Sequence, residues 1–298
     1  PWIKKIEPDD DTSADCTYKR IIESMERLDV DCLDFYQIWN INSSEHCRQA
    51  VIRGGMLDGI RRAMDEGLVK HTGFTTHDTP ENISQYIDDF DWCETILFTY
   101  NILNQKYADV MAKAHDKGIA TVVMNPLGGG MLAEDSPVIK SAVLEAAGTD
   151  DIVQIAYRYL ACNKNIDTIL CGINKPSDIV STLENYRKPP LTKQEIETIE
   201  KALRKLSPED MGFCTSCKYC MPCPQGINIP AMMNVSYLDN ILKVPRKAKD
   251  VYGWHISENN PYKSAYLSSC VECGQCEEKC TQKLNITKEL KSLSEKYE

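Results

Sequence analysis

Two runs of cysteine are the residues in this chain whose type and spacing could do chemistry. The segment "FCTSCKYCMPCPQGINIP" (213–230) holds four thiols three residues apart, and "CVECGQCEEKC" (270–280) nearly repeats the arrangement. A disulfide scaffold would be small, secreted and rich in cysteine throughout. Here eight of the 14 cysteines lie between Cys214 and Cys280. Clustered thiols on an otherwise ordinary chain indicate metal binding in a reducing cytoplasm.

The spacing Cys-x2-Cys-x2-Cys is typical of a loop that directs three thiolates at one [4Fe–4S] cluster. The runs resemble those of two-cluster ferredoxins, in which the last cysteine of each run binds the cluster of the other. Two departures are a two-residue gap before Cys223 and Thr281 in place of a proline. The resemblance implies two clusters, one held by Cys214, Cys217, Cys220 and Cys280, the other by Cys270, Cys273, Cys276 and Cys223.

Zinc and purely structural thiols are the alternatives. A zinc site usually takes two Cys-x2-Cys pairs, so a third cysteine at the same spacing would be surplus to a tetrahedral site. The other cysteines are scattered, and we interpret them as small buried hydrophobic residues. They are Cys16, Cys32, Cys47, Cys93, Cys162 and Cys171.

Upstream of these runs, amphipathic stretches alternate with short apolar runs from residue 13 to residue 186. The amphipathic stretches have helical spacing, and the apolar runs have the length of buried strands. Five such helix–strand units predict a parallel α/β sheet whose strands are covered on both faces. The predicted strands are 32–39, 68–74, 95–101, 120–126 and 167–172.

The alternation ends at the pair Pro189–Pro190. Thr192 and Glu195 then predict a capping box for a helix that runs to about Leu206. Beyond it the composition shifts to Cys, Pro, Met and Lys, which predicts two domains, 1–206 and 207–298. We expect no repeat beyond the cysteine runs. We interpret the basic stretch 242–250 as a solvated linker, with docking of an acidic electron carrier as the alternative.

The overall composition excludes several classes of protein. A net charge of −10 over 298 residues argues against binding driven by nucleic-acid phosphates. No apolar run reaches the length of a membrane span, and no signal peptide is recognisable. Because the chain starts at Pro1, without a capped helix or a full strand, we expect a fragment or a processed product.

Five segments together resemble the aldo-keto reductase superfamily: "ERLDVDCLDFYQIWN", "GLVKHTGFTTHD", "FTYNILN", "GIATVVMNPLGGGML" and "DTILCGINKPSD". The motif "CMPCPQGINIP" narrows the resemblance to the branch with a C-terminal iron–sulfur domain. This implies an α/β fold, a (β/α)8 TIM-type barrel followed by a small ferredoxin-like domain, with carbonyl reduction by NADP(H) or NAD(H). The chain matches strands four to eight, so we expect upstream residues, a partner chain or a homo-oligomer to cover the open edge.

The resemblance implies that the catalytic Asp, Tyr and Lys of the family precede Pro1, and it aligns the family's histidine with Trp39. An indole N–H is not acidic enough to serve as a general acid. The stretch "DTSADCTY" (11–18) has the wrong spacing for the family motif, and we interpret it as a helix start. His77 is the catalytic candidate because barrel sites form where strands end, whereas His71 is interpreted as a core or surface residue.

The resemblance also implies a set of nucleotide contacts. Thr75 and Thr76 align with contacts to the nicotinamide amide, while Leu97 replaces the family's glutamine and Ser181-Thr182 its Glu-Asn pair. The loop "NPLGGG" and a lysine before a helix N-terminus could bind phosphate. The candidate cofactor-binding residues are Thr75, Thr76, Asn125, Leu127, Gly128, Gly129 and Lys175.

Two functions fit these residues. The first is an iron–sulfur oxidoreductase of aldo-keto reductase type, which passes electrons through two clusters to or from a nicotinamide cofactor or a carbonyl substrate in the barrel. The second is an electron-transfer or scaffold protein with a degenerate barrel, favoured by the inert side chains of Trp39 and Leu97. We expect a small-molecule substrate or an external electron carrier as partner, no nucleic acid, no membrane, and a cytoplasmic location.

Overall fold

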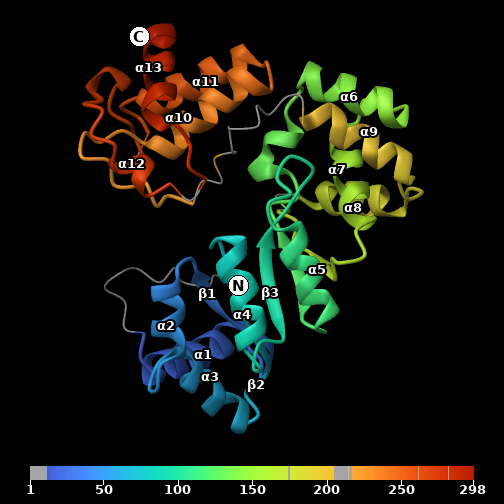
Figure 1. The fold of residues 1–298 in the computed structure, drawn as a ribbon, viewed down its shortest axis with the longest axis vertical. Helices are drawn as coiled ribbons and strands as arrows, with labels where there is room; N and C mark the ends of the chain where they lie inside the picture. Colours follow the sequence, from blue (N-terminus) through green and yellow to red (C-terminus); the bar gives the residue numbers. More distant parts are fainter. Residues whose placement is uncertain (1–11, 174, 205–213, 215–216, 261, 281) are drawn as a thin grey trace. The chain divides into compact units, whose positions relative to one another are not determined.

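A computed structural model describes residues 12–173, 175–204, 214, 217–260, 262–280 and 282–298 (Figure 1). The chain forms two compact units. Of the described residues, the first unit comprises those up to Tyr100, 105–126 and 163–172; the second comprises 101–104, 127–162 and those from 173 onward. The predicted domain boundary near residue 207 lies outside the described residues. Each helix in the described ranges is too short or too polar to cross a bilayer.

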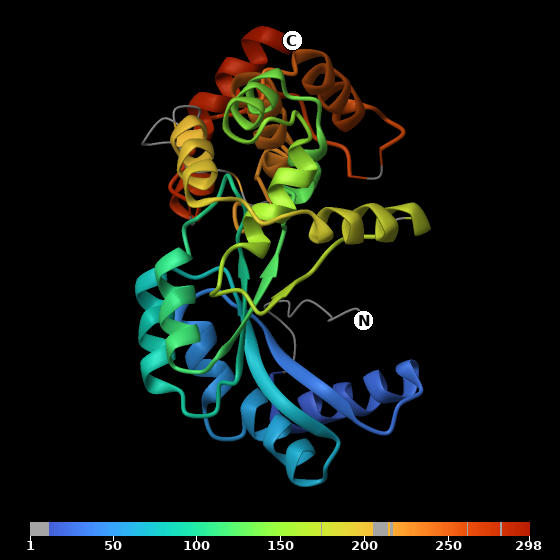
Figure 2. The ribbon, with the colours of Figure 1, turned by 90° about the vertical axis from the view of Figure 1, so that its right-hand side faces the viewer.

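The first unit is built on a five-stranded parallel sheet with the strands in chain order. Figure 2 shows the strands side by side. Each predicted apolar run forms one strand, which confirms the parallel α/β fold, although the last run keeps only two residues in the sheet. The strands are β1 (Leu33–Ile41), β2 (Val69–Thr76), β3 (Thr95–Thr99), β4 (Ala120–Met124) and β5 (Thr168–Ile169).

One helix precedes the first strand, and further helices connect the strands. Ser13 accepts the Cys16 N–H at 3.3 Å and so begins the first helix, which confirms that "DTSADCTY" is a helix start. A short helix after β1 was not predicted, because eight residues with two buried positions give little periodic signal. The helices are α1 (Ala14–Leu28), α2 (Ser44–Val51), α3 (Met56–Asp65), α4 (Pro80–Asp89) and α5 (Ala108–Asp116).

Aromatic side chains fill the core beside β2. Phe74 is fully buried, and the rings of Tyr86, Phe90 and Trp92 have centroids within 6.4 Å of its own. Strands β2 and β3 approach closely at Gly73, where an added Cβ would lie 1.8 Å from the Thr95 carbonyl oxygen. These contacts hold the carboxyl end of β2, which carries the barrel candidates, in a fixed position.

The part of the second unit before residue 205 is helical. It contains the 3-10 helix η1 (Gly128–Ala133) and helices α6 (Pro137–Ala147), α7 (Ile152–Ala161), α8 (Pro176–Arg187) and α9 (Lys193–Arg204). The predicted capping box is confirmed, since the Thr192 N–H donates to Glu195 Oε2 at 2.6 Å and the Glu195 N–H donates to Thr192 Oγ1 at 3.2 Å. Helix α6 was missed, although a proline opens it and a left-handed glycine ends it.

The rest of the second unit carries both cysteine runs. Interpreting residues 242–250 as a linker is wrong, because Pro245 opens a helix whose Ala248 and Tyr252 are buried. Upstream of that helix, the Leu242 carbonyl accepts the Ser136 hydroxyl at 2.8 Å. The elements are α10 (Ile229–Ser236), the π-helix η2 (Tyr237–Ile241), α11 (Pro245–Ile256), the 3-10 helix η3 (Leu267–Ser269), α12 (Gln275–Glu278) and α13 (Ile286–Tyr297).

Candidate functional site

The cysteines of the second unit surround two pockets. Pocket A, with about 330 Å³ of open space, takes three cysteines from the first run and the last cysteine of the second. Apolar residues of α10 and the segment after the second run complete its wall. Its lining is Cys214, Cys217, Lys218, Cys220, Ile229, Pro230, Met233, Cys280, Gln282, Leu284 and Ile286.

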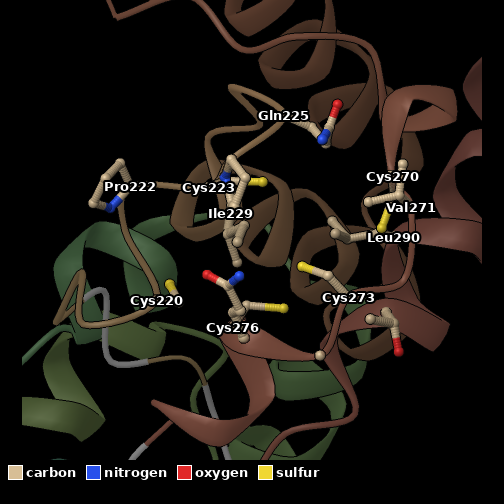
Figure 3. Close-up of a pocket in the computed structure, with 14 residues that line it drawn as sticks. Cys220, Pro222, Cys223, Gln225, Ile229, Cys270, Val271, Cys273, Cys276 and Leu290 are labelled. Atoms are coloured by element: carbon tan, nitrogen blue, oxygen red, sulfur yellow. The ribbon is translucent and has the colours of Figure 1, made fainter.

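Pocket B, with about 380 Å³ of open space, takes three cysteines of the second run and the last cysteine of the first, and Cys220 also lines it. Figure 3 shows the sulfur atoms of Cys223, Cys273 and Cys276 directed toward a common space, with Cys270 beside it. Cys220 and Ile229 line both pockets, so the two sites are neighbours. The lining also includes Pro222, Pro224, Gln225, Val271, Gly274, Gln275, Thr287 and Leu290.

An internal repeat extends beyond the cysteine runs, which corrects the expectation that none exists. The segments "CPQGINI" (223–229) and "CTQKLNI" (280–286) share a cysteine, a glutamine, an asparagine and an isoleucine at matching positions. Both make the same turn: the Gly226 N–H donates to the Cys223 carbonyl at 2.9 Å, and the Lys283 N–H donates to the Cys280 carbonyl at 3.2 Å. Each segment leads into a helix, α10 or α13.

The two helices that follow these turns form the apolar walls of the pockets. Met233 on α10 lines pocket A, and Leu290, at the equivalent position of α13, lines pocket B. Both side chains are buried, at 7% and 1% exposure. These wall residues were not predicted, although the matching "QxxNI" motifs are a signal for them.

The thiols of pocket A influence one another. Burial and then the neighbouring thiols of Cys214, Cys217 and Cys280 raise the pKa of Cys220 to about 12. In pocket B, burial, then Glu277 and more weakly Cys270, raise the pKa of Cys276. Free thiols in these positions would therefore be protonated at neutral pH, and a bound metal would displace the protons because thiolate is the ligand form.

The donor set fits an iron–sulfur cluster better than a single ion. Within the described ranges no three cysteine, histidine or carboxylate groups lie close enough to share one metal ion. A cube binds each thiolate at a different iron, so its four ligands stand around a larger space than one zinc ion needs. Four cysteines line pocket A and five line pocket B, with Cys220 common to both, so each apolar-walled pocket offers at least the four thiols that a cube needs.

In the first unit, the hydroxyls of the threonines predicted to contact a nicotinamide form hydrogen bonds with the backbone of the neighbouring strand. The Thr75 hydroxyl accepts the Asn40 N–H at 2.6 Å, and Thr75 is 3% exposed. Thr76 is fully buried, and its hydroxyl donates to the Ile41 carbonyl at 2.7 Å. Both hydroxyls therefore link the end of β2 to the end of β1 by hydrogen bonds.

The positions that correspond to the family's polar residues hold apolar or inert groups. Trp39 lies near the end of β1, and its buried Nε1 has no hydrogen-bond partner among the described residues. Leu97 is 7% exposed and lies opposite Thr75 in the register of β2 and β3. His77 follows β2 and is half-buried, and burial together with the charge of Lys106 lowers its pKa.

An acidic residue next to His77 was not anticipated. Asp78 is 4% exposed, and its carboxylate accepts the Tyr86 hydroxyl at 2.8 Å and the Thr79 N–H at 2.7 Å. The Tyr107 hydroxyl donates to the Asp78 carbonyl at 2.9 Å. Asp78 thus fixes the turn from β2 into α4, and the only sequence signal was an acidic residue just before a Thr-Pro helix start.

The predicted phosphate-binding elements lie at turns. Asn125 and Gly128 have left-handed φ angles of 57° and 59°, and Gly129 lies within η1. Leu127 precedes that helix as its N-cap residue. The glycine at position 128 is therefore explained by the turn itself, since left-handed backbone favours glycine.

Lys175 is exposed immediately before α8, as the phosphate-site hypothesis requires. The Asp178 carboxylate, however, already accepts the Lys175 backbone N–H at 3.1 Å. A phosphate at this helix start would have to share the site with that carboxylate. At the position of the family's acidic pair, the Ser181 hydroxyl donates to the Asp178 carbonyl at 3.2 Å.

Two known protein families match different parts of the chain. Residues 4–204 match the aldo/keto reductase family, and residues 213–285 match a 4Fe–4S dicluster domain. The second match covers all eight cysteines that line pockets A and B. It therefore supports iron–sulfur clusters over zinc.

Two curated relatives are named as oxidoreductases. The chain is 26% identical to L-galactose dehydrogenase of Arabidopsis thaliana over 234 residues, which covers 66% of this chain and 68% of that protein. It is 27% identical to an uncharacterised oxidoreductase of Schizosaccharomyces pombe over 123 residues, or 41% of this chain and 37% of that protein. The chain thus spans only part of each relative.

Solved structures show the fold of the reductase part. An aldo-keto reductase from Bacillus halodurans in its holo form superposes with a TM-score of 0.55 at 19% identity, over 65% of this chain and 69% of that one. A thermostable aldo-keto reductase in complex with the inhibitor epalrestat gives 0.53 at 17% identity, over 64% and 67%. The chain belongs to the aldo/keto reductase family and carries a 4Fe–4S dicluster domain after it.

Proposed function

We propose that this protein is an iron–sulfur oxidoreductase that moves electrons between an external one-electron carrier and a nicotinamide cofactor or carbonyl substrate in its reductase part. The observation that carries the proposal is the crosswise grouping of eight cysteines into two adjacent pockets. Such a grouping is the one that two [4Fe–4S] clusters require.

The cysteines have defined roles in this proposal. Cys214, Cys217, Cys220 and Cys280 hold the cluster of pocket A, and Cys223, Cys270, Cys273 and Cys276 hold that of pocket B. When bound, each cluster supplies a site that gains or loses one electron at a time. The shared wall residue Ile229 is 2% exposed and lines both sites.

The electrons balance if the external one-electron carrier delivers an electron twice for each molecule of product. Reduction of a carbonyl to an alcohol takes two electrons and two protons, and reduction of a nicotinamide takes two electrons and one proton. Two one-electron sites suit a two-electron product, and the protons come from solvent. His77 is neutral at pH 7 because its pKa is lowered, so it is better suited to accept a proton than to donate one.

The nucleotide would bind through backbone more than through side-chain hydroxyls. The hydroxyls of Thr75 and Thr76 already hydrogen-bond to the backbone of β1, so these residues would form the wall of the nucleotide site and would not donate hydrogen bonds to the nucleotide. The turn that contains Asn125, Leu127, Gly128 and Gly129 offers backbone groups, and Lys175 offers a cation. These residues remain the proposed cofactor contacts.

An anaerobic preparation tests the proposal. We expect about eight irons and eight acid-labile sulfides per chain, and visible absorbance that bleaches on addition of reduced viologen. Addition of a nicotinamide nucleotide or a carbonyl from a substrate panel should then restore the absorbance, with two electrons consumed per product. Colourless protein that contains zinc would overturn the proposal.

A second function, an electron-transfer or scaffold protein with an inert barrel, is favoured by Trp39. Its N–H is buried without a partner in the described part of the chain, and it stands where the family places an acid. If this function holds, the clusters form and bleach, but neither nucleotides nor carbonyls reoxidise them. Quenching of protein fluorescence by an added nucleotide would detect nucleotide binding, which the oxidoreductase requires and an inert barrel does not.

A further inference from the structure

The internal repeat makes pockets A and B comparable residue by residue. In each cysteine run, the residue after the second cysteine and the residue three positions after the last cysteine adopt left-handed backbone. Because the last cysteine of each run lines the pocket of the other run, each pocket has one such residue from each run. At pocket A these are Lys218, with φ 67°, and Lys283, with φ 53°. At pocket B they are Gly274, with φ 74°, and Gly226, with φ 76°.

Glycine is the residue that this backbone conformation favours, and the half around pocket B uses it twice. A lysine in the same conformation is strained, because its Cβ crowds the following carbonyl. Pocket A nevertheless has a lysine at both positions. Lys218 lines pocket A directly, and Lys283 lies between two of its lining residues, Gln282 and Leu284.

Carboxylates, unlike these lysines, lie beside the cysteines of pocket B. Glu272 and Glu277 adjoin the pocket B cysteines Cys273 and Cys276. The Glu277 carboxylate is held at the start of α13, where it accepts the Thr287 N–H at 2.8 Å. The residue equivalent to Glu277 in the first run is the uncharged Met221.

Two further charges lie next to Cys280 and offset each other. Glu278 and Lys279 are both exposed, and they precede that cysteine in the chain. The asymmetry between the pockets therefore comes from Lys218 and Lys283 on one side and from Glu272 and Glu277 on the other.

We propose that Lys218 and Lys283 raise the reduction potential of the cluster in pocket A, so that it is the first of the two to be reduced. This inference rests on the proposed iron–sulfur function. Reduction adds a negative charge to a cluster, which neighbouring cations stabilise and neighbouring carboxylates oppose. The two halves share the ligand types and the turn after the last cysteine, and their charged side chains differ.

Solvent acts in the opposite direction. Cys273 of pocket B is exposed, whereas the equivalent Cys217 is half-buried, and water also stabilises the reduced form of a cluster. We assign the order to the charges because four charged side chains differ between the pockets, against the exposure of one sulfur. Since both lysines are exposed, the difference in potential should shrink as salt is added.

Potentiometric titration of the anaerobic full-length protein, followed by electron paramagnetic resonance, tests the proposal. The double variant K218G/K283G should lower one of the two potentials and leave the other unchanged. At a fixed applied potential, the ratio of reduced to oxidised cluster should fall about twofold to thirtyfold, the range for two exposed charge interactions. The variant K218Q/K283Q removes the charges but keeps each Cβ, and it should do the same.

The reciprocal variant assigns the two signals. An added Cβ at Gly274 meets no atom within 4 Å, and Lys218 occupies the equivalent left-handed position of the first run, so G274K can place a cation beside pocket B despite the strain of its backbone. It should raise the potential that K218G/K283G leaves unchanged. The control K249Q removes an exposed lysine from α11, which lines neither pocket, and should move neither potential.

The outcomes separate this inference from the proposed function. Protein without iron and sulfide overturns the proposed function and this inference with it. Two clusters whose potentials do not respond to the lysine variants, or which both respond to the same variant, overturn this inference alone. A potential that rises in K218G/K283G overturns it as well.

Discussion

The Thr75 hydroxyl accepts the backbone N–H of Asn40 at 2.6 Å, across the ends of two neighbouring strands. Asn40 has a left-handed φ of 58°, so β1 turns at the point where Thr75 holds it. The register of β1 and β2 shifts between Ile38 and Ile41, at this same turn. One side chain of β2 thus sets the direction in which the chain leaves β1, next to Trp39.

Replacing Thr75 with valine should destabilise the first unit. The substitution keeps the shape of the side chain but removes the acceptor of the Asn40 N–H, which costs about 1–2 kcal/mol for a buried group. Urea unfolding measures the loss. The control T198V removes an exposed hydroxyl on α9 and should change stability by less than about 0.5 kcal/mol. Equal effects of the two variants would contradict the role of Thr75 in the sheet.

Much of the fold was predictable because apolar runs between capped helices are a strong signal. Each of the five predicted strands exists, and the Thr192–Glu195 capping box is formed as expected. The errors lie where local signals are short. β5 keeps two of six predicted residues, and α2 is too short to show a period.

At the candidate site, the spacing of the cysteines predicted which of them gather around a pocket, but sequence patterns could not reveal the hydrogen bonds that other side chains make. The cysteines have fixed chemistry, so their pattern predicted which ones share a pocket. Thr75 and Thr76 were expected at a cofactor, yet a hydroxyl can also fasten two strands, and only the structure shows that use. Lys218 and Lys283 were overlooked because their shared backbone conformation is not visible in the sequence.

The pKa of His77 should make the stability of the protein depend on pH. Burial, and then the charge of Lys106, lower this pKa from its usual value of 6.5. Below pH 6.5 the unfolded chain therefore binds more protons at this residue than the folded chain does, so stability falls as the pH drops. The variant H77Q should show a shallower loss of melting temperature between about pH 7.5 and pH 5.5. A titration of the His77 ring by NMR with a midpoint above 6.5 would contradict the expectation.

Glu298 should stabilise the loop that leads into pocket B. Its carboxylate accepts the N–H groups of Leu267 and Ser268 at 2.5 and 2.9 Å, and the Tyr252 hydroxyl at 2.7 Å. Burial tends to raise its pKa, but these hydrogen bonds outweigh burial and lower the pKa to about 2. The stabilisation is therefore complete above about pH 4.5, the usual pKa, and is lost as the pH falls toward 2.

The variant E298Q should consequently unfold at lower urea concentration than the parent at neutral pH, and the two should converge as the pH falls below about 4.5. The neighbouring E295Q removes an exposed carboxylate on α13 and serves as the control. A gap between E298Q and the parent that persists unchanged at pH 3 would show that Glu298 does not act through its charge.

Paired alanine substitutions test how the cysteines are shared. If each cluster takes its fourth ligand from the other run, Cys220 and Cys280 belong to one cluster, whereas Cys223 belongs to the other. The double variant C220A/C280A should then keep about four irons per chain, while C220A/C223A should lose nearly all of them. Iron and sulfide analysis of anaerobic protein measures both. If each run instead binds its own cluster, the two results exchange places, so the comparison decides between the arrangements even if one substitution weakens folding.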